Sequence, residues 1–260
     1  MIYTINNEDV ITHPIFYVTE VYRDEENNEL SITAYDALYE ASKIPLSDTD
    51  LNDDVYSFNS LFYNISRYLK VNEEIAVDNN ISSLSYWDGV IVCAGYGNFE
   101  ETNNLKEVLD DIAEALQAVY FVDHENKLHI ARLNPEAESL KIDKSKQIDL
   151  KSGENRRLGV ITSATELGNN ITVSTEESGS TQYIRDNEFF IEDSDAETYL
   201  ANGIEYYKGI SINQFECEWR GNPLSQILER LEITTKDNKK VYSFLINDTI
   251  NYNGCFSQNT

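Results

Sequence analysis

The chain has 260 residues, of which 41% are apolar, and its formal charge of −26 is spread along the whole length. This length favours two compact units, and no apolar run is long enough to cross a membrane. The negative charge opposes nucleic-acid binding, because neutralised phosphates supply most of the non-specific affinity. We therefore expect a globular chain that does not bind DNA and whose acidic surface serves solubility or repels DNA.

The N-terminal decapeptide MIYTINNEDV has neither a basic region nor an apolar stretch, so we expect no ordinary secretory signal. The three cysteines, Cys93, Cys217 and Cys255, lie far apart and form no CxxC pair. Their spacing and odd number predict neither a disulfide framework nor a zinc cluster. We expect all three thiols to be reduced.

Residues 15–35 have the alternation of a β-hairpin. The polar residues DEENNE separate two runs, PIFYVTEVYR and LSITAYDA, in which apolar and polar residues alternate. Two strands cannot bury a core by themselves, so we expect this hairpin to be an arm that docks on other strands. Its apolar positions are Phe16, Val18 and Val21 in the first run and Leu30, Ile32 and Ala34 in the second.

Residues from about 44 to 135 predict a small α/β unit with two helices. The first helix lies within SFNSLFYNISRYLKV, where Ser57 or Asn59 can cap the N-terminus. Further on, GVIVCAGYG predicts a buried strand that ends in a glycine-rich turn. The apolar face of the first helix would hold Leu61, Phe62, Ile65, Tyr68 and Leu69.

The second helix is predicted over 104–117, with Thr102 or Asn103 as its N-cap and acidic residues in its early turns. Strands at 119–122 and 128–133, joined by the turn HEN, follow it. We expect the helix to pack its apolar face on these strands. The apolar positions have helical spacing and are Leu105, Val108, Leu109, Ile112 and Leu116.

From residue 137 to the C-terminus, short strands are separated by Gly, Asn and Asp, a pattern that favours a barrel or a sandwich. One helix interrupts the strands around 195–209. Asp195 is its expected N-cap, and Gly203 should weaken it by about 1 kcal/mol. The residues expected to share one helix face are Leu200, Ile204 and Tyr207.

Two motifs that resemble ligand sites are incomplete. CAGYGNFE has Gly95 and Gly97 but Glu100 where a dinucleotide loop needs its third glycine, and this carboxylate would repel a pyrophosphate. DTDLNDDVYSFN begins like a calcium loop, with Asp48, Asp50 and Asn52 at the first three ligand positions, but it lacks the glycine at position six and the glutamate at position twelve. We expect a solvated acidic loop there and no nucleotide site.

Catalysis by cysteine would need an activated thiol near His13, His124 or His129, and no local motif indicates one. We expect His124 in a turn and His129 in a strand, as surface or half-buried residues. The adjacent carboxylates of Asp110 and Asp111 would point about 100° apart on a helix and could not face one sugar. We therefore expect no catalytic residue, no cofactor and no metal site, and we expect that the protein is not an enzyme.

Aromatic residues are numerous, with 17 Tyr, 10 Phe and 2 Trp. Tyrosine-rich surfaces are favoured at protein interfaces and on carbohydrate platforms. Alternating strands also favour tyrosine, so we expect most of these rings in strands or cores.

Three stretches together resemble the tail-hub family of bacteriophages. In FYVTEVYRDEENNELSITAYDALYEASK, the matching residues are Val18-Thr19-Glu20, Arg23-Asp24 and 32–37. LKEVLDDIAEALQAVYFVDHENKLHIARL is similar to the family's helix and following hairpin, with Ala118 and Asn126 in place of the usual glycines.

The third stretch, from GNPLSQ to the C-terminus, is similar to the last barrel segment of the family. Glu229-Arg230 replace a Gly-Asp pair, and Cys255 replaces the second glycine of a Tyr-Asn-Gly-Gly motif. The three stretches cover about half of the chain.

The resemblance implies an α+β chain, with mainly-β, barrel-like hub domains and a small inserted α/β domain. Residues 1–43 would be part of a first, ring-forming β-domain, with its hairpin. Residues 44–136 would be the inserted domain, and the strand of the hairpin would stop at Asp36 because that domain begins there. Residues 137–260 would be a second β-barrel-like domain with a helical insertion around 195–209.

The resemblance also implies a structural virion protein of a phage or prophage tail tip, a baseplate hub assembled in the host cytoplasm. Such a hub connects the tail tube to the host-facing fibre or spike. Its partners would be two further copies in a homotrimer, the adjoining tail tube or distal tail ring proteins, and a fibre or spike. No membrane would be involved, and DNA would be passing cargo only.

In the family, two β-domains from each of three subunits alternate in a ring of pseudo-sixfold shape. The hairpin at 15–35 and the strands at 230–252 would then occupy equivalent positions in the ring. Two other functions remain open. The Tyr and Trp count suits a glycan-binding host-recognition module, and hydrolase extensions in the family suggest a murein hydrolase-associated domain.

Overall fold

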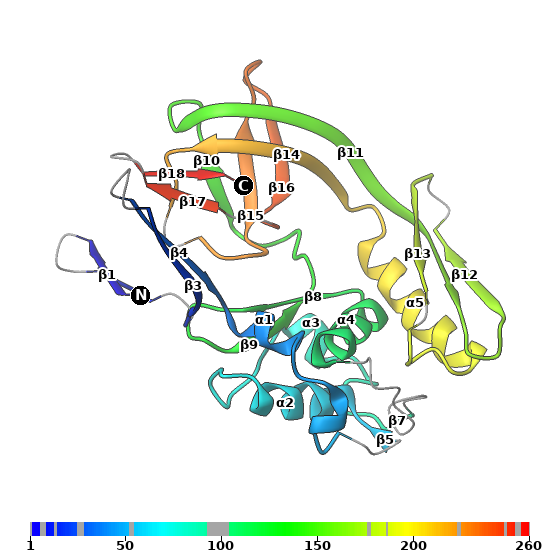
Figure 1. The fold of residues 1–260 in the computed structure, drawn as a ribbon. Coiled ribbons are helices and arrows are strands. Elements are labelled where there is room, and N and C mark those ends of the chain that lie inside the picture. Colours follow the sequence, from blue (N-terminus) through cyan, green and yellow to red (C-terminus); the bar gives the residue numbers. More distant parts are fainter. Residues whose placement is uncertain are drawn as a thin grey trace. The chain divides into compact units, whose positions relative to one another are not determined.

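The computed structural model describes residues 2–5, 9–12, 15–24, 29–51, 55–92, 104–175, 178–185, 187–222, 225–246, 249–252 and 256–259. Contacts divide the chain into two compact units (Figure 1). The first unit comprises Met1–Ala115 and Val119–Ala131, and the second comprises Leu116–Ala118 and Arg132–Thr260. Both units mix helices and sheets, so the α+β class is confirmed. The expected division at residues 43 and 136 stays a prediction.

The first unit opens with two antiparallel strand pairs. β1 (Ile2–Ile5) pairs with β2 (Asp9–Thr12), and β3 (Tyr17–Asp24) pairs with β4 (Glu29–Tyr35). The hairpin predicted from the sequence is therefore confirmed. Within the described residues, β3 and β4 pair with no other strand, including those of 230–252.

β4 ends at Tyr35 because Asp36 begins helix α1 (Ala37–Ala41). The Asp36 carboxylate accepts a hydrogen bond of 3.0 Å from the backbone N–H of Leu38. This is N-cap geometry, which satisfies a backbone donor that the helix cannot. The first and last residues of α1 are fully buried.

The rest of the first unit packs short helices with two small sheets. β6 (Ala76–Val77) pairs in parallel with β9 (Leu128–Ala131), which pairs antiparallel with β8 (Val119–Val122), and β5 (Val55–Tyr56) pairs with β7 (Ile91–Val92). The helices are the 3-10 helix η1 (Leu46–Asp48), α2 (Phe58–Tyr68), α3 (Asn79–Ser82) and α4 (Leu105–Leu116). The predicted strand GVIVCAGYG is described only at β7, because its later residues lie outside the described part.

Both predicted helices of this unit are confirmed, with one correction to a cap. Ser57 caps α2 as expected. At α4 the Asn104 side chain accepts from the N–H of Glu107, and the Glu107 carboxylate accepts from the N–H of Asn104. This reciprocal pair is a capping box, so the cap is Asn104 and not Thr102 or Asn103, which lie outside the described residues.

The predicted apolar faces of the two helices are buried, except that Tyr68 is half-buried. In α4 all five predicted positions are between 0% and 1% exposed. The strands expected at 119–122 and 128–133 are β8 and β9, although β9 ends at Ala131.

The second unit is organised by β11 (Gln147–Ala164), a strand of 18 residues that changes partners along its length. Its first part pairs with β14 (Ser211–Trp219), and its last part pairs with β12 (Asn170–Ser174) and β13 (Ser180–Ile184). β14 continues the sheet to β18 (Phe256–Asn259) and β17 (Thr249–Tyr252). Figure 1 shows β11 and β14 running side by side as a long two-stranded antiparallel ribbon.

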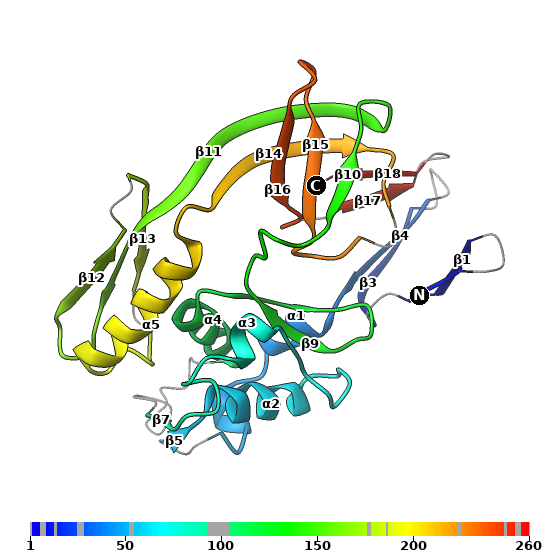
Figure 2. The same cartoon turned by 180° about the vertical axis from the view of Figure 1, so that it is seen from behind.

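A second sheet contains β10 (Ser139–Ile142), β15 (Arg230–Thr234) and β16 (Lys240–Phe244), which run side by side in Figure 2. Side chains from β10, β14, β15 and the segment after β16 form one core, which consists of Ile142, Cys217, Trp219, Leu231, Ile233 and Leu245. No sheet closes on itself in the part of the chain that is described. The barrel-like character of the domain therefore stays a prediction.

Helix α5 (Asp193–Tyr207) packs on β11 and β12 and completes a lobe. The predicted helix is confirmed, and Leu200 and Ile204 are buried. Asp195 as N-cap is wrong, because the helix begins at Asp193. The Asp193 carboxylate accepts hydrogen bonds from Thr165 and Asn169, which fix the start of the helix two residues earlier.

Gly203 in α5 has a packing role beyond its low helix propensity. A Cβ at this position would lie 2.4 Å from Cγ of Gln117, so only glycine lets the two segments approach this closely. Among the described residues, no helix is both long and apolar enough to cross a membrane.

Candidate assembly surface

Hydrogen bonds of Asn126 join the base of the β3–β4 hairpin to the rest of the first unit. The side-chain oxygen of Asn126 accepts from the N–H of Ile15 at 3.0 Å, and its amide nitrogen donates to the Lys70 carbonyl at 3.2 Å. The Tyr17 hydroxyl donates to the same carbonyl at 2.9 Å. Asn126 has a φ of 59°, a conformation that asparagine tolerates better than most residues. Asn126, which replaces a glycine of the tail-hub pattern, therefore keeps the turn conformation and adds side-chain hydrogen bonds to the hairpin base.

The end of β4 at the hairpin base packs against α1. The rings of Tyr35 and Tyr39 stack with their centroids 4.1 Å apart, and the Lys43 ammonium lies 3.8 Å from the Tyr39 centroid. Burial raises the pKa of Asp36, while hydrogen bonds from backbone N–H groups oppose that shift. Burial also raises the pKa of Tyr17, and the charge of Glu40 adds to the effect.

One face of the hairpin is aliphatic and exposed. Val18 pairs with Ala34 and Val21 pairs with Ile32, while Thr19 is the extra residue of a β-bulge. Because of the bulge, two valines that are three residues apart share one face. Arg23 pairs with Leu30 and lies at the end of the same face. We call the four large apolar members the aliphatic face, and they are 57–62% exposed: Val18, Val21, Leu30 and Ile32.

The opposite face carries Tyr22, which is 64% exposed. The outer edges of both strands also have no strand partner within the described residues. A two-stranded ribbon with an exposed apolar face and open edges is a site for association with further strands. The hairpin is therefore the candidate functional surface of the first unit.

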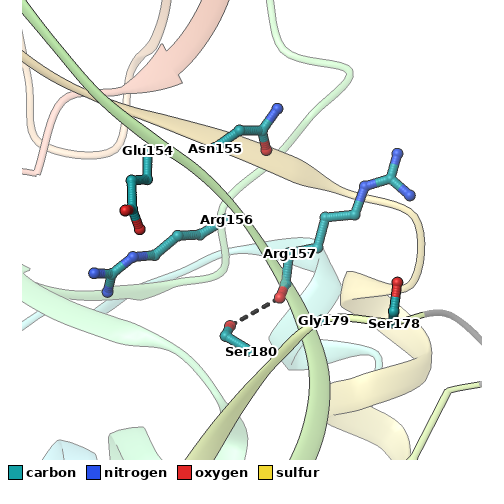
Figure 3. A pocket seen from close by; sticks show the side chains of 7 residues that line it. All are labelled: Glu154, Asn155, Arg156, Arg157, Ser178, Gly179 and Ser180. Atoms are coloured by element: carbon teal, nitrogen blue, oxygen red, sulfur yellow. Dashed lines mark hydrogen bonds between the residues drawn. The ribbon is translucent and has the colours of Figure 1, made fainter.

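Two open hollows lie along the exposed β11–β14 ribbon of the second unit. The hollow in Figure 3 has a volume of about 650 Å³ and is lined by Glu154, Asn155, Arg156, Arg157, Ser178, Gly179 and Ser180. The guanidinium groups of Arg156 and Arg157 point in different directions, and the Ser180 hydroxyl donates to the Arg157 carbonyl at 2.8 Å. The two cations therefore do not converge on one ligand.

This hollow arises where β13 meets β11. A Cβ on Gly159 would lie 2.7 Å from the backbone of Gly179, so the two glycines allow the strands to touch there. The second hollow, of about 640 Å³, lies further along the ribbon and includes Phe215, Phe244 and Ile246.

The described residues contain no group of three or more His, Cys, Asp or Glu placed to hold a metal ion. Cys217 is buried, and burial raises the pKa of its thiol to about 11, which opposes formation of a nucleophilic thiolate. Cys93, Cys255 and His13 lie outside the described residues. The nucleotide-like residues at 95–100 lie outside them as well.

The predicted positions of two histidines are confirmed, with His124 in a turn and His129 in β9. His129 Nε2 lies 3.1 Å from an Asp78 oxygen, and its ring stacks on Phe121. Asp110 binds Lys106 at 2.5 Å and accepts from the Tyr120 hydroxyl at 2.6 Å. Burial, and after it this hydrogen bond, raises the pKa of Tyr120. These contacts give each group a structural partner.

The calcium-like loop is described only in part. Asp48 ends the 3-10 helix η1, and Asp50 accepts a hydrogen bond from the Tyr68 hydroxyl. Residues 52–54 of that motif, which include Asn52, lie outside the described part.

No protein-family model matches the chain, and no curated protein matches it. Among solved structures, a tail protein from Neisseria meningitidis MC58 matches with a TM-score of 0.66 and 8% identity, over 97% of this chain and 79% of that one. The 43 kDa tail protein of prophage MuSo2 from Shewanella oneidensis matches with a TM-score of 0.57 and 12% identity, over 98% of this chain and 78% of that one. At such identities the likeness concerns the fold. The structural neighbours of this chain are phage tail proteins, and the chain has their fold.

Proposed function

We propose that the protein is a structural component of a phage or prophage tail tip, a hub that connects the tail tube to a host-facing fibre or spike. The observation that carries the proposal is a fold shared with tail proteins over nearly the whole chain. The hub acts by shape and assembly, without catalysis. Its location is the virion tail, and its neighbours are tail tube or distal ring proteins.

The aliphatic face is the proposed contact between copies in a homotrimer. Full burial of an exposed Val, Leu or Ile contributes about 1.5–3 kcal/mol, so four side chains that are about 60% exposed can contribute several kcal/mol on docking. The open edges of β3 and β4 can add main-chain hydrogen bonds to a neighbouring sheet. Both terms favour association through this hairpin.

The net charge of −26 suits a ring through which DNA passes. Like charges repel phosphate and leave the nucleic acid without the counterion-release term that drives binding. DNA is therefore proposed as passing cargo.

A double substitution, Val21→Asp with Ile32→Asp, tests the contact, with Val90→Asp and Leu167→Asp as the matched control. The control residues are 80% and 67% exposed and lie outside the hairpin. We expect the wild-type chain to form a trimer in sedimentation velocity, the hairpin variant to lose it, and the control to keep it. Both variants should retain the wild-type thermal unfolding, because all four side chains are exposed.

Quantitative mass spectrometry of purified tails tests the wider proposal and should find three copies of the chain in each tail. Absence of the chain from tails would refute the hub function. Binding to a glycan array that is lost on Tyr22→Ala would support a glycan-binding module instead. Clearance of purified cell wall would support the murein hydrolase alternative.

A further inference from the structure

Basic side chains gather at one end of the second unit, in a chain that is otherwise strongly acidic. They come from the end of β10 and the loop after it, from the turn between β15 and β16 and the first residue of β16, and from the residue after β14. All of them are exposed. We call them the basic tip, and they are Lys141, Lys144, Lys146, Arg220, Lys236, Lys239 and Lys240.

The fold holds these segments together. The Lys144 ammonium donates to the Lys236 carbonyl, and the Gln147 side chain donates to the Thr234 carbonyl at 2.8 Å. Beneath them β10 pairs in parallel with β15. Segments about 90 residues apart in sequence therefore present one surface.

The backbone N–H of Arg220 donates to the Lys146 carbonyl at 2.8 Å and places the third segment beside the first. Backbone contacts and the side chains of Lys144 and Gln147 together hold the three segments of the tip in place.

The charge balance of the tip is opposite to that of the chain. The segments of the tip, 141–146, 220 and 232–240, hold seven of the 20 basic residues and three acids, Asp143, Glu232 and Asp237, while Asp149 and Glu218 pair in the adjoining strands. Lys240 binds Glu232 at 2.8 Å, which raises the pKa of the lysine and lowers that of the glutamate. The remainder of the chain has 13 basic against 43 acidic residues. Each molecule therefore carries both a positive patch and a large excess of negative surface.

We infer that the basic tip docks on the acidic surface of a second copy of this chain. The inference rests on the proposed homotrimer and names one of its contacts. Head-to-tail contacts in a closed ring join two different, complementary patches of the same subunit. The chain supplies the basic tip and a large excess of acidic residues elsewhere, and attraction between them would steer and orient the copies against the general repulsion of like-charged molecules.

A triple charge reversal, Lys146→Glu, Lys236→Glu and Lys239→Glu, tests the contact. It leaves Lys144 in place, because that side chain joins the two loops. The matched control reverses Lys43, Lys106 and Lys208 to Glu, which changes the net charge equally. The control side chains are 46–48% exposed and lie on helices or beside them.

We expect the tip variant to raise the dissociation constant of self-association about tenfold or more in low salt, and the control to change it far less. Added salt should weaken the wild-type association, because exposed charge pairs are screened beyond about 10 Å at 0.1 M salt. The tip variant should unfold at the wild-type temperature, and the control slightly below it, because its three lysines form exposed ion pairs. Equal effects of the two reversals would overturn the inference, as would a wild-type chain that stays monomeric in low salt.

Zero-length carbodiimide cross-linking of mixed light and heavy isotope-labelled chains identifies the partner. We expect cross-links from tip lysines to carboxylates of the other copy. Cross-links that avoid the tip would overturn the inference. It would also be overturned if the tip variant lost binding to duplex DNA or to anionic vesicles but kept its self-association. If tails contain the chain and the tip reversal leaves them unchanged, the inference fails while the hub function stands. If tails lack the chain, the hub function fails.

Discussion

The buried guanidinium of Arg132 should be a large single contributor to the stability of the second unit. The side chain is 1% exposed. Nε and one terminal nitrogen donate to the Leu116 carbonyl at 2.8 and 2.6 Å, and the other terminal nitrogen donates to Asn202 at 2.9 Å. Leu116 is the last residue of α4, so its carbonyl is one that the helix leaves unsatisfied and that lies at the negative end of the helix dipole.

Arg132→Ala removes these bonds and leaves the buried Leu116 carbonyl and the half-buried Asn202 side chain without them. A hydrogen bond to a charged group contributes about 1.5–3 kcal/mol, so one bond to each acceptor gives an expected loss of about 3–6 kcal/mol. Arg132→Lys should recover only part of it, because an ammonium cannot reproduce the planar fork. Arg156→Ala is the control, since an exposed arginine should change stability by at most about 0.5 kcal/mol.

A urea titration followed by tryptophan fluorescence measures this difference. The chain has two tryptophans, and a Trp87→Phe background leaves the buried Trp219 as the reporter of the second unit. The slope of the transition should stay constant across variants, so that midpoints report stability. Equal midpoints for Arg132→Ala and Arg156→Ala would refute the reasoning.

Two further predictions concern buried side chains. Ile112→Ala or Leu109→Ala in α4 should cost the first unit about 2–5 kcal/mol in denaturant titration, since both side chains are 0% exposed, and a neutral result would mean that this core is wrongly placed. In a variant whose other two cysteines are serine, the Cys217 thiol should react with a thiol reagent at pH 8 only after unfolding. Its raised pKa of about 11 leaves about one part in a thousand as thiolate, so fast reaction of the native protein would contradict the burial.

Sequence periodicity identified the elements that bury one face. Helices α2 and α4 and the last part of β11 follow it, because each has one apolar side in a core. The stretch KSGENRR, from Lys151 to Arg157, gave no strand signal. It has no apolar residue, and both of its faces are exposed in the ribbon with β14. Its strand conformation depends on a partner about 60 residues away, which local pattern does not contain.

Long-range contacts also account for what the sequence missed at caps and at the candidate surface. The start of α5 depends on Thr165 and Asn169 holding Asp193, so the nearby Asp195 was as plausible from local pattern alone. For the hairpin, alternation predicted two strands but not that the aliphatic face stays uncovered. The sequence marked Asn126 only because it stands at a glycine of the tail-hub pattern. The hydrogen-bond partners of its side chain follow only from the fold.

The way β11 and β14 pair has a consequence for how the second unit can vary. Their last register pair joins Arg157 to Ser211, so everything between, including β12, β13 and α5, is topologically the turn of one long hairpin. A domain built in this way can enlarge, shrink or exchange that excursion while the order of the remaining strands is preserved. The lobe of β12, β13 and α5 is therefore a site where related chains can carry insertions, and so present different surfaces, while the sheet of β11 and β14 stays the same.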